Sequence, residues 1–350
     1  MVQNEAHRYY IVTNRKIRLG IIGFGLIGRH LYRLALESED VEIVALCDIG
    51  KPSIIHYLLA TEGVGNIPCS LEGNTLKNSR FSTRILSADR PVEIPWDVFD
   101  VDFVVDATRI HNSAMDMQAH LDAGARRVLI SMLPDDYIDR MVIPGINDAQ
   151  IQPEDKMICA GSATTGALAT LLHTLENAGL EIDRAFMTTV HSYTSDQALQ
   201  DTAGPDRRRS RSAAVNIIPN TNTSPSWVEK ILPHLEGRLG GNALNVPVQK
   251  GSMLDTTVIF KHTGVTVEEV NGALENGAIA SPGLVATTQD PIVSSDVIDC
   301  RQSLLFDAAA TIQSGERMVK TIGWYETLGH ACRILEVIRA YHDLDCGGAS

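Results

Sequence analysis

Residues 16–28 read KIRLGIIGFGLIG, and this stretch decides the fold. Its first part is an apolar run typical of a buried strand in a parallel sheet. The run ends at Gly23, and Gly23, Gly25 and Gly28 then fit the spacing GxGxxG. Residues 25–38 continue with apolar side chains at helical spacing. A glycine-rich turn between a buried strand and a helix indicates a dinucleotide-binding unit.

There is a physical reason for a glycine at each of these three positions of the loop. Gly23 allows a tight turn, Gly25 lets the backbone approach a pyrophosphate, and Gly28 lets the helix pack on the strand. The helix N-terminus adds free N–H groups and partial positive charge for the phosphates. Asp48 ends the next apolar strand, where a carboxylate accepts hydrogen bonds from the adenosine ribose and repels a 2'-phosphate. We therefore predict NAD as the cofactor, bound by Gly23, Phe24, Gly25, Leu26, Ile27, Gly28 and Asp48.

Strands and helices alternate over the first half of the chain. Further apolar strands are predicted at 41–48, 102–108 and 125–131, with a helix at 113–125. From residue 163 a long helix is followed by alternating segments at 183–194, 241–249 and 253–262, and the chain ends in an amphipathic helix. The predicted class is α/β, with a Rossmann-type parallel-sheet domain and an α+β catalytic domain whose sheet is largely antiparallel.

The composition argues against several kinds of partner. With 30 Lys and Arg against 43 Asp and Glu, the formal charge is -13, which lacks the basic field that nucleic acid needs. No run approaches the roughly eighteen apolar residues of a membrane span. Six cysteines are scattered without metal-ligand spacing, as suits free thiols in a reducing compartment. We expect a cytoplasmic protein without a metal, nucleic-acid or membrane partner, and read residues 1–15 as an N-terminal extension.

Over residues 16–342 the chain resembles phosphorylating glyceraldehyde-3-phosphate dehydrogenases. The similar segments, in order, are GIIGFGLIGR, HLDAGARRVLIS, MTTVHSYTSDQ, RRRSRSAAVNIIP, ILPHLEGRLGGNALNVPV and VSSDVIDCRQSLLFDA. The resemblance implies an NAD-binding domain of residues 16–162, completed by the C-terminal helix 326–350, and a catalytic domain of residues 163–325. It also implies a small-molecule substrate, phosphorylated or not, and a homotetramer, with a dimer as the alternative.

The resemblance breaks at the family's nucleophile. The family uses a Ser-Cys-Thr-Thr-Asn stretch, which places a thiolate at a helix N-terminus. Residues 162–166 here read Ser-Ala-Thr-Thr-Gly, so Ala163 stands at the position of the thiolate. Because a methyl group cannot attack a carbonyl, we predict that no acyl intermediate forms there. His191 falls where the family has its general base, and we assign it as the catalytic residue.

The family's substrate contacts are partly retained. Thr194 matches a phosphate-contacting threonine, and Ser162 and Thr164 remain as well. Asn245 stands at a phosphate-binding arginine, so a neutral amide replaces a bidentate cation. Asn222 aligns with the threonine of a Thr-Gly pair that holds inorganic phosphate. We take these five residues as candidate substrate ligands at rebuilt anion sites.

The nicotinamide end of the cofactor site differs from the family too. Residues 324–330 read WYETLGH, one residue shorter than in the family, and lack the asparagine that fixes the carboxamide. Thr327 is the candidate replacement for this asparagine. The resemblance also implies that Thr108 and Ser131 contact the cofactor. Ile22 and Leu26 replace two polar residues that help to hold NAD in relatives.

Three functions remain open from the sequence. The first is an NAD-dependent oxidoreductase repurposed for chemistry without a thioester, with His191 as acid or base. The second is a catalytically inactive NAD-binding or regulatory homologue. The third is an ordinary dehydrogenase with an engineered Cys-to-Ala substitution at Ala163. The changes at Asn222 and Asn245 and in the WYET segment argue against the third, because an engineered variant would differ at one site.

Overall fold

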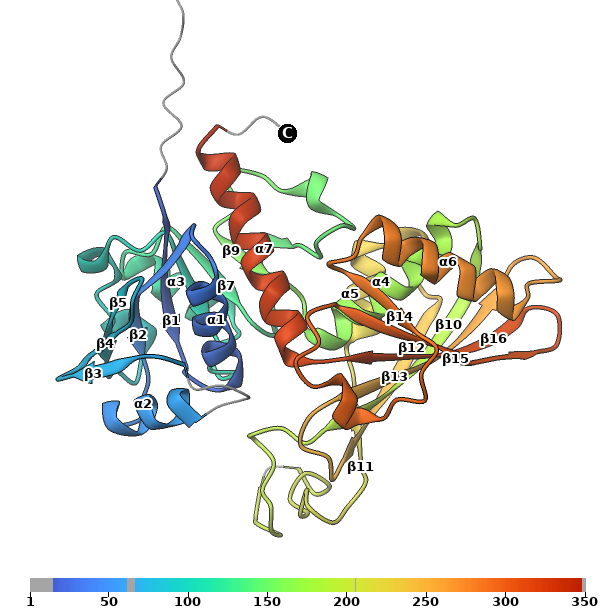
Figure 1. Ribbon diagram of the computed structural model, residues 1–350, viewed down its shortest axis with the longest axis horizontal. Coiled ribbons are helices and arrows are strands. Elements are labelled where there is room, and N and C mark those ends of the chain that lie inside the picture. The colour runs from blue at the N-terminus through green and yellow to red at the C-terminus, as the bar shows by residue number, and fades with distance from the viewer. Residues whose placement is uncertain (1–14, 62–66, 205, 348–350) are drawn as a thin grey trace, which may run out of the picture.

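The computed structural model describes residues 15–61, 67–204 and 206–347. They form two sheets, one in each half of the chain, with the C-terminal helix α7 (Thr327–Asp345) between the halves (Figure 1). Of the predicted N-terminal extension only Arg15 lies inside the described residues, where it pairs with Asp100 and Asp102. Within those ranges no helix combines the length and apolar character needed to cross a membrane.

The first sheet has nine strands in the order β3-β4-β5-β2-β1-β6-β7-β9-β8. They are β1 (Ile17–Ile22), β2 (Val41–Cys47), β3 (Ser70–Glu72), β4 (Thr75–Lys77), β5 (Ser82–Leu86), β6 (Phe103–Asp106), β7 (Arg127–Ile130), β8 (Arg140–Met141) and β9 (Met157–Cys159). The pairs from β5 through β2, β1, β6 and β7 to β9 are all parallel, and only the β3-β4-β5 edge is antiparallel. The predicted parallel sheet is therefore confirmed.

Both faces of this sheet are covered, because alternate side chains of its strands enter different cores. Leu19 of β1 packs in one core with apolar residues of α1 (Leu26–Glu37) and α7. Ile22 packs in the other with Met117 of α3 (Ala114–Asp122). Near-continuous apolar strands such as β1 are the pattern that two covered faces require. The remaining helix of this half is α2 (Pro52–Thr61).

The second sheet has seven strands in the order β11-β12-β10-β13-β16-β15-β14. They are β10 (Ile182–Ser192), β11 (Ile218–Thr221), β12 (Leu239–Val246), β13 (Ser252–Phe260), β14 (Val285–Thr288), β15 (Leu304–Ser314) and β16 (Met318–Tyr325). Four of its pairs are antiparallel, as predicted, but β10 with β12 and β14 with β15 are parallel. Its helices are α4 (Ala163–Asn177), α5 (Ser224–Ile231) and α6 (Val267–Ala280), which cover one face of the sheet (Figure 1).

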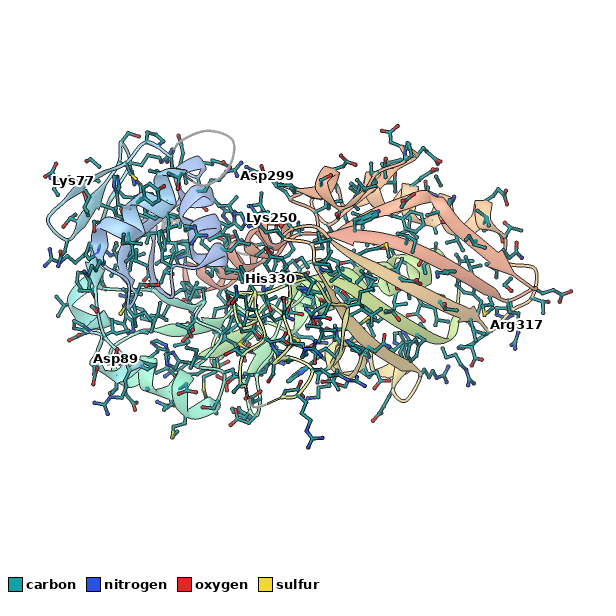
Figure 2. All side chains as sticks on the ribbon, turned by 90° about the horizontal axis from the view of Figure 1, so that it is seen from below. Lys77, Asp89, Lys250, Asp299, Arg317 and His330 are labelled. Carbon is teal, nitrogen blue, oxygen red and sulfur yellow. The ribbon has the colours of Figure 1, made fainter. Side chains whose placement is uncertain are left out.

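The junction of the two halves positions the site. Viewed at right angles to Figure 1, His330 of α7 lies between the halves, while Lys77 and Arg317 mark opposite ends of the molecule (Figure 2). The core that contains Ile22 and Met117 continues through α4 into the second half. The first turn of α4 is thereby held close to the carboxyl ends of the parallel strands.

Candidate functional site

The glycine loop has the geometry that its spacing predicts. Gly23 has φ +85°, and a Cβ there would stand 2.8 Å from backbone atoms of Ala107 and Thr108. At Gly28 a Cβ would stand 2.5 Å from the carbonyl oxygen of Gly23. At Gly25, by contrast, a Cβ would have no heavy atom of the described residues within 4 Å beyond its chain neighbours. The backbone is therefore open to a ligand where a pyrophosphate is expected, and α1 begins one residue later.

Asp48 lies beside this loop and holds its conformation. Its Oδ2 accepts a 2.7 Å hydrogen bond from the backbone N–H of Phe24, and its Oδ1 accepts one of 2.7 Å from Gly50. A carboxylate has about four lone-pair positions, so acceptor capacity remains for ribose hydroxyls. The ring of Phe24 packs in the core edge-on to Tyr32, so Phe24 offers a ligand only its backbone. Leu26 and Ile27 are both half-buried in the first turn of α1.

A buried carboxylate organises the neighbouring strand end. Asp106 closes β6, and its Oδ1 accepts hydrogen bonds from the N–H and hydroxyl of Thr108 at 2.9 and 2.6 Å. Its Oδ2 lies 3.0 Å from Nδ1 of His111 and 3.2 Å from Nε2 of His120. Burial alone would raise the pKa of Asp106, but the hydrogen bonds from these histidines outweigh it and hold that pKa at about 2.

Asp106, His111 and His120 are close enough together to suggest a metal site. Trp96 argues against one, since its Nε1–H donates to Nδ1 of His120 at 3.1 Å. This donor leaves Nδ1 as the acceptor and places the proton of the neutral ring on Nε2, which faces Asp106. A metal bound at Nε2 of His120 would have to displace that proton. The proton could not move to Nδ1, because Nδ1 already accepts the hydrogen bond from Trp96. The three residues therefore form a hydrogen-bond network.

Ser131 and Thr327, the other residues predicted to contact NAD, lie at the same junction. Ser131 follows β7, its carbonyl accepts a 3.0 Å hydrogen bond from Nε2 of His330, and its hydroxyl finds no partner among the described residues. Thr327 is the first residue of α7, whose cap residue Glu326 accepts a hydrogen bond from the N–H of Leu328. Burial raises the pKa of Glu326. The structure thus places both residues at the carboxyl edge of the parallel sheet or next to it.

The first turn of α4 contains Ala163, the residue to which the sequence resemblance assigns the nucleophile position. Ser162 caps the helix by accepting a 3.1 Å hydrogen bond from the N–H of Thr165, and Ala163 is the first helical residue. Thr165 in turn donates from its hydroxyl to that of Ser224 at 3.0 Å, and Ser224 begins α5. The backbone of Ser224 donates to Oδ1 of Asn222 at 2.7 Å. These contacts join Asn222 to the first turn of α4 through Ser224.

His191 stands near the end of β10 in a defined tautomer. Its Nδ1 lies 2.6 Å from the carbonyl oxygen of Ser192, so Nδ1 carries a proton and donates it. Nε2 accepts no hydrogen bond from the described part of the chain and is left with its lone pair. Burial lowers the pKa of His191, and the positive charge of Arg109 lowers it further. The imidazole is therefore neutral near pH 7 and is poised to accept a proton.

Tyr325 connects the elements around His191. The two rings meet edge-to-face with centroids 6.1 Å apart. The Tyr325 hydroxyl is shared with the hydroxyls of Thr164 on α4 and Thr189 on β10. Thr164 is buried, and its hydroxyl bonds to that of Tyr325, which leaves it hydrogen-bonding capacity for one further contact. Sequence reasoning did not single out Tyr325 or its bond to Thr164.

Asn245 lies directly beside His191 on the neighbouring strand, because β10 and β12 pair in parallel with these two residues in register. Asn245 is buried, and its Oδ1 lies 3.5 Å from Nδ2 of Asn220. Thr194 follows β10, and its hydroxyl donates to Asp196. The structure thus brings His191, Asn245 and Thr194 to one end of the second sheet.

Arg109 is another residue of this region that sequence reasoning missed. It belongs to the segment between β6 and α3, yet its Nη2 lies 3.7 Å from Oδ1 of Asp196 in the other half of the chain. The available signal was its place just after a parallel strand, at the sheet edge that carries the glycine loop. A lone arginine in a loop is usually a solvated side chain, so the signal was weak.

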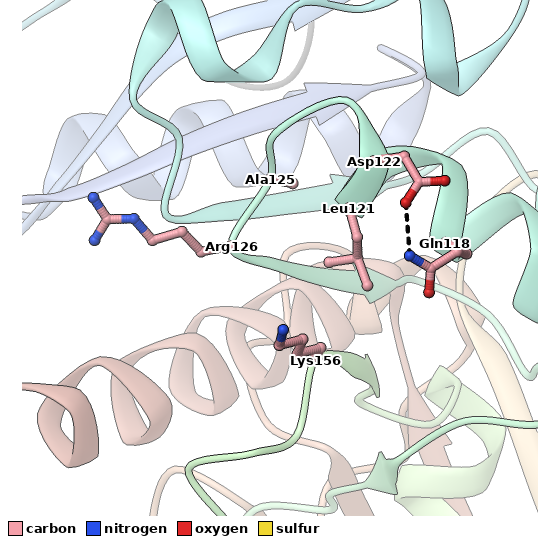
Figure 3. A pocket seen from close by; sticks show the side chains of 6 residues that line it. All are labelled: Gln118, Leu121, Asp122, Ala125, Arg126 and Lys156. Carbon is pink, nitrogen blue, oxygen red and sulfur yellow. Dashed lines mark hydrogen bonds between the residues drawn. The ribbon is translucent and has the colours of Figure 1, made fainter.

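A hollow of about 480 Å³ lies elsewhere on the surface (Figure 3). It is shallow and is lined by Gln118, Leu121, Asp122, Ala125, Arg126 and Lys156. None of these belongs to the glycine loop, to the first turn of α4 or to β10. A much smaller cavity of about 10 Å³, roughly enough for one water, lies beside Ala163 and is also lined by Ser162, Glu326 and His330. We place the candidate site at the first turn of α4, the end of β10 with His191, and the open glycine loop.

Comparison with known proteins agrees with this geometry. Residues 17–114 match the family model for the glyceraldehyde 3-phosphate dehydrogenase NAD-binding domain, and residues 162–327 match that for its C-terminal domain. The chain belongs to the glyceraldehyde-3-phosphate dehydrogenase family. It is 37% identical over 329 residues to glyceraldehyde-3-phosphate dehydrogenase 2 of Streptomyces arenae, covering 92% of this chain and 97% of that protein.

Two further members of the glyceraldehyde-3-phosphate dehydrogenase family are similarly close. The enzyme of Kitasatospora aureofaciens is 38% identical over 331 residues, with 92% of this chain and 98% of that protein covered. The enzyme of Mycobacterium tuberculosis is 36% identical over 334 residues, with 92% and 97% covered. Membership establishes a dehydrogenase fold with NAD as the cofactor, as the glycine loop predicts.

Proposed function

We propose that the protein is an NAD-dependent oxidoreductase that acts on a small carbonyl or hydroxyl compound without forming a thioester. The observation that carries the proposal is His191, a neutral imidazole beside Asn245 whose Nε2 has no hydrogen-bond partner in the part of the chain that the structure describes. NAD, when bound, supplies the hydride acceptor or donor. The chain then needs a group to handle the hydroxyl proton, and Nε2 of His191 can take or return it.

The thioester route requires a thiolate, and Ala163 offers none. Cys159 is the nearest cysteine in sequence, four residues before Ala163. It is buried in β9, where its thiol donates to the carbonyl of Met132 and burial raises its pKa. A buried thiol of raised pKa is inert as a nucleophile. Cys159 is therefore no substitute for the nucleophile that we infer is missing.

The proposal is tested by turnover. The protein is incubated with small aldehydes, hydroxy acids or phosphorylated sugars together with NAD or NADH. Absorbance follows the nicotinamide, and mass spectrometry identifies the products. We expect stoichiometric oxidation or reduction of at least one class, with no enzyme-bound acyl group on quenching. Binding of NAD without turnover of any class would favour the inactive NAD-binding or regulatory homologue.

The wild type is expected to show no phosphorylating oxidation of glyceraldehyde 3-phosphate, and Ala163→Cys is expected to recover little of it. A new thiol at the first position of α4 gains from the helix dipole, but Asn245 supplies no cation. Loss of one charged hydrogen bond costs about 1.5–3 kcal/mol, or roughly tenfold or more in rate. Ala163→Ser is the matched control. A family-like rate in Ala163→Cys would mean that an engineered substitution at Ala163 is the only defect.

NAD is expected to bind at least about tenfold more tightly than NADP, because like charges about 4 Å apart near a protein surface repel by a few kcal/mol. In Asp48→Asn this preference should shrink, since the amide keeps an acceptor for Phe24 or Gly50 but loses the charge. Calorimetric titration of both cofactors measures the ratio. Tighter binding of NADP to the wild type would show that Asp48 does not face the ribose.

We also propose a homotetramer, with a dimer as the alternative, located in the cytoplasm. The support is the long segment between β10 and β11, which projects from the body of the molecule (Figure 1). It exposes Val215 and Ile217 at 77% and 65%, an exposure that an interface would remove. Sedimentation equilibrium tests the oligomer, and fractionation of cells that express the protein tests its location.

A further inference from the structure

Arg109 connects the two halves of the protein. The loop that carries it leaves β6 in the cofactor half, and its guanidinium forms a 3.7 Å ion pair with Asp196, which follows β10 in the other half. Asp196 also accepts from the hydroxyl of Thr194 and pairs with Arg209. The cation therefore lies beside the chain segment that carries His191 and Thr194.

The backbone at Arg109 is strained in order to hold this position. Its φ is +63°, in the left-handed region that a residue with a side chain rarely adopts. Such strain persists only where the surroundings fix it, and it gathers at functional sites. Here Asp106 fixes both flanks, accepting from Thr108 before Arg109 and from His111 after it. The buried network therefore anchors the loop that presents Arg109.

The charges around His191 favour an anion at this place. Of the side chains facing it, Arg109 is cationic and lowers the pKa of His191, and the neighbouring Asn245 is neutral. The carboxylate of Asp196 is shared between Arg109 and Arg209, and its contact with Arg109 is long. The Arg109 side chain is 44% exposed, so much of its donor capacity is not engaged by the protein.

We propose that Arg109 is the anion-binding residue of the substrate site. It would pair with a carboxylate or phosphate on the substrate, placing the reacting carbon near Nε2 of His191, and would exchange its long contact with Asp196 for this ligand. A planar guanidinium suits either anion, through two parallel hydrogen bonds. This deepens the proposed function and rests on it for the reaction, but the anion site itself is testable without turnover.

The first experiment uses the NAD-saturated protein and inorganic phosphate as the probe. Calorimetry is expected to show phosphate binding weakened at least about tenfold in Arg109→Gln, the loss for one charged hydrogen bond. Arg109→Lys should retain part of the affinity, and Asp196→Asn should increase it by releasing the guanidinium. Arg317→Gln, at the far end of the molecule, is the matched control (Figure 2). Equal phosphate affinity in wild type and Arg109→Gln would overturn the inference.

The diphosphate of NAD is the other anion that Arg109 could meet, and the affinity for NAD distinguishes the two. We expect NAD affinity within about twofold of wild type in Arg109→Gln. A tenfold weaker NAD affinity with unchanged phosphate binding would assign Arg109 to the cofactor and overturn the inference. Arg109→Lys is the control for the folding of Arg109→Gln, because lysine keeps the charge and about the length of the arginine side chain.

A second readout, NMR titration of His191, tests the placement of the charge. Removing the cation in Arg109→Gln should raise the pKa of His191, and Arg109→Lys should restore it. An unchanged pKa of His191 would overturn the placement of Arg109 beside it.

Turnover then separates the anion-site proposal from the proposed oxidoreductase function. Phosphate binding through Arg109 without any turnover keeps the anion site and rejects the oxidoreductase. Turnover of an anionic substrate with the same KM in Arg109→Gln keeps the oxidoreductase and rejects the anion site.

Discussion

Replacing His191 with asparagine is expected to lower turnover by about 10²–10⁴-fold, the usual contribution of a positioned acid or base. Affinity for NAD should stay within about twofold, because His191 lies on β10 and none of its contacts involves the glycine loop. Asparagine keeps a side chain of similar size near Tyr325 but cannot exchange a proton near pH 7. Steady-state rates and NAD calorimetry on the same preparation measure both effects.

His262→Asn is the matched control, since His262 is exposed and, among the described residues, pairs with Glu181 alone. It should leave both quantities unchanged. A full rate in His191→Asn would reject His191 as the proton-transfer group, while equal loss of rate and NAD affinity would indicate a folding defect instead.

The pH profile gives the same mechanism a second test. The active form in the direction of oxidation is the neutral imidazole, and burial with the charge of Arg109 lowers the pKa of His191 below the usual value of about 6.5. The kcat/KM should therefore fall as the pH drops through this lowered pKa and be level near pH 7. In Arg109→Gln the acid limb should move to higher pH. A limb that stays in place would mean that another group controls it.

The second large effect is expected at Gly23. In Gly23→Ala the new methyl group meets the backbone of Ala107 and Thr108 at 2.8 Å, and the residue must keep φ at +85°. Left-handed strain and displaced backbone together should lower the free energy of unfolding by about 2–4 kcal/mol. Because the loop must shift, affinity for NAD should fall as well. Chemical denaturation and calorimetry measure the two losses.

Gly25→Ala is the control that separates stability from binding. Its φ is -69°, and its added methyl group enters open space, so stability should change by less than about 0.5 kcal/mol. The methyl group would, however, occupy the space expected for the pyrophosphate. Wild-type NAD affinity in Gly25→Ala would show that the diphosphate does not lie over this residue.

Local patterns were enough to predict the cofactor half. The apolar run of β1, the three glycines and Asp48 form one continuous signal, and in the structure they form a strand, a turn and a carboxylate bonded to the backbone of Phe24. The alternation of β10 and β13 likewise predicted strands of the second sheet. The helix α2 and the short strands β3–β5 were not predicted, because their residues show no strong periodicity over enough length.

The rest of the site depends on contacts between distant residues. The parallel pairing of β10 with β12, which places Asn245 beside His191, spans a connection that contains β11 and α5, and sequence patterning does not reveal such pairings. Arg109 and Tyr325 are also joined to their partners only by the tertiary fold. For Thr164 the family resemblance gave the position but not the direction of the hydroxyl.

The packing of α7 sets the order in which the two halves of the protein can finish folding during synthesis. This helix of 19 residues is the last element of the described residues, yet its Ile334 and Ile338 belong to the core that covers β1, the first strand among them. One apolar face of the first sheet stays partly uncovered until α7, which follows the second sheet in the sequence, has been synthesised. Until α7 packs there, the first half exposes apolar surface of the kind that makes partly folded chains prone to aggregate.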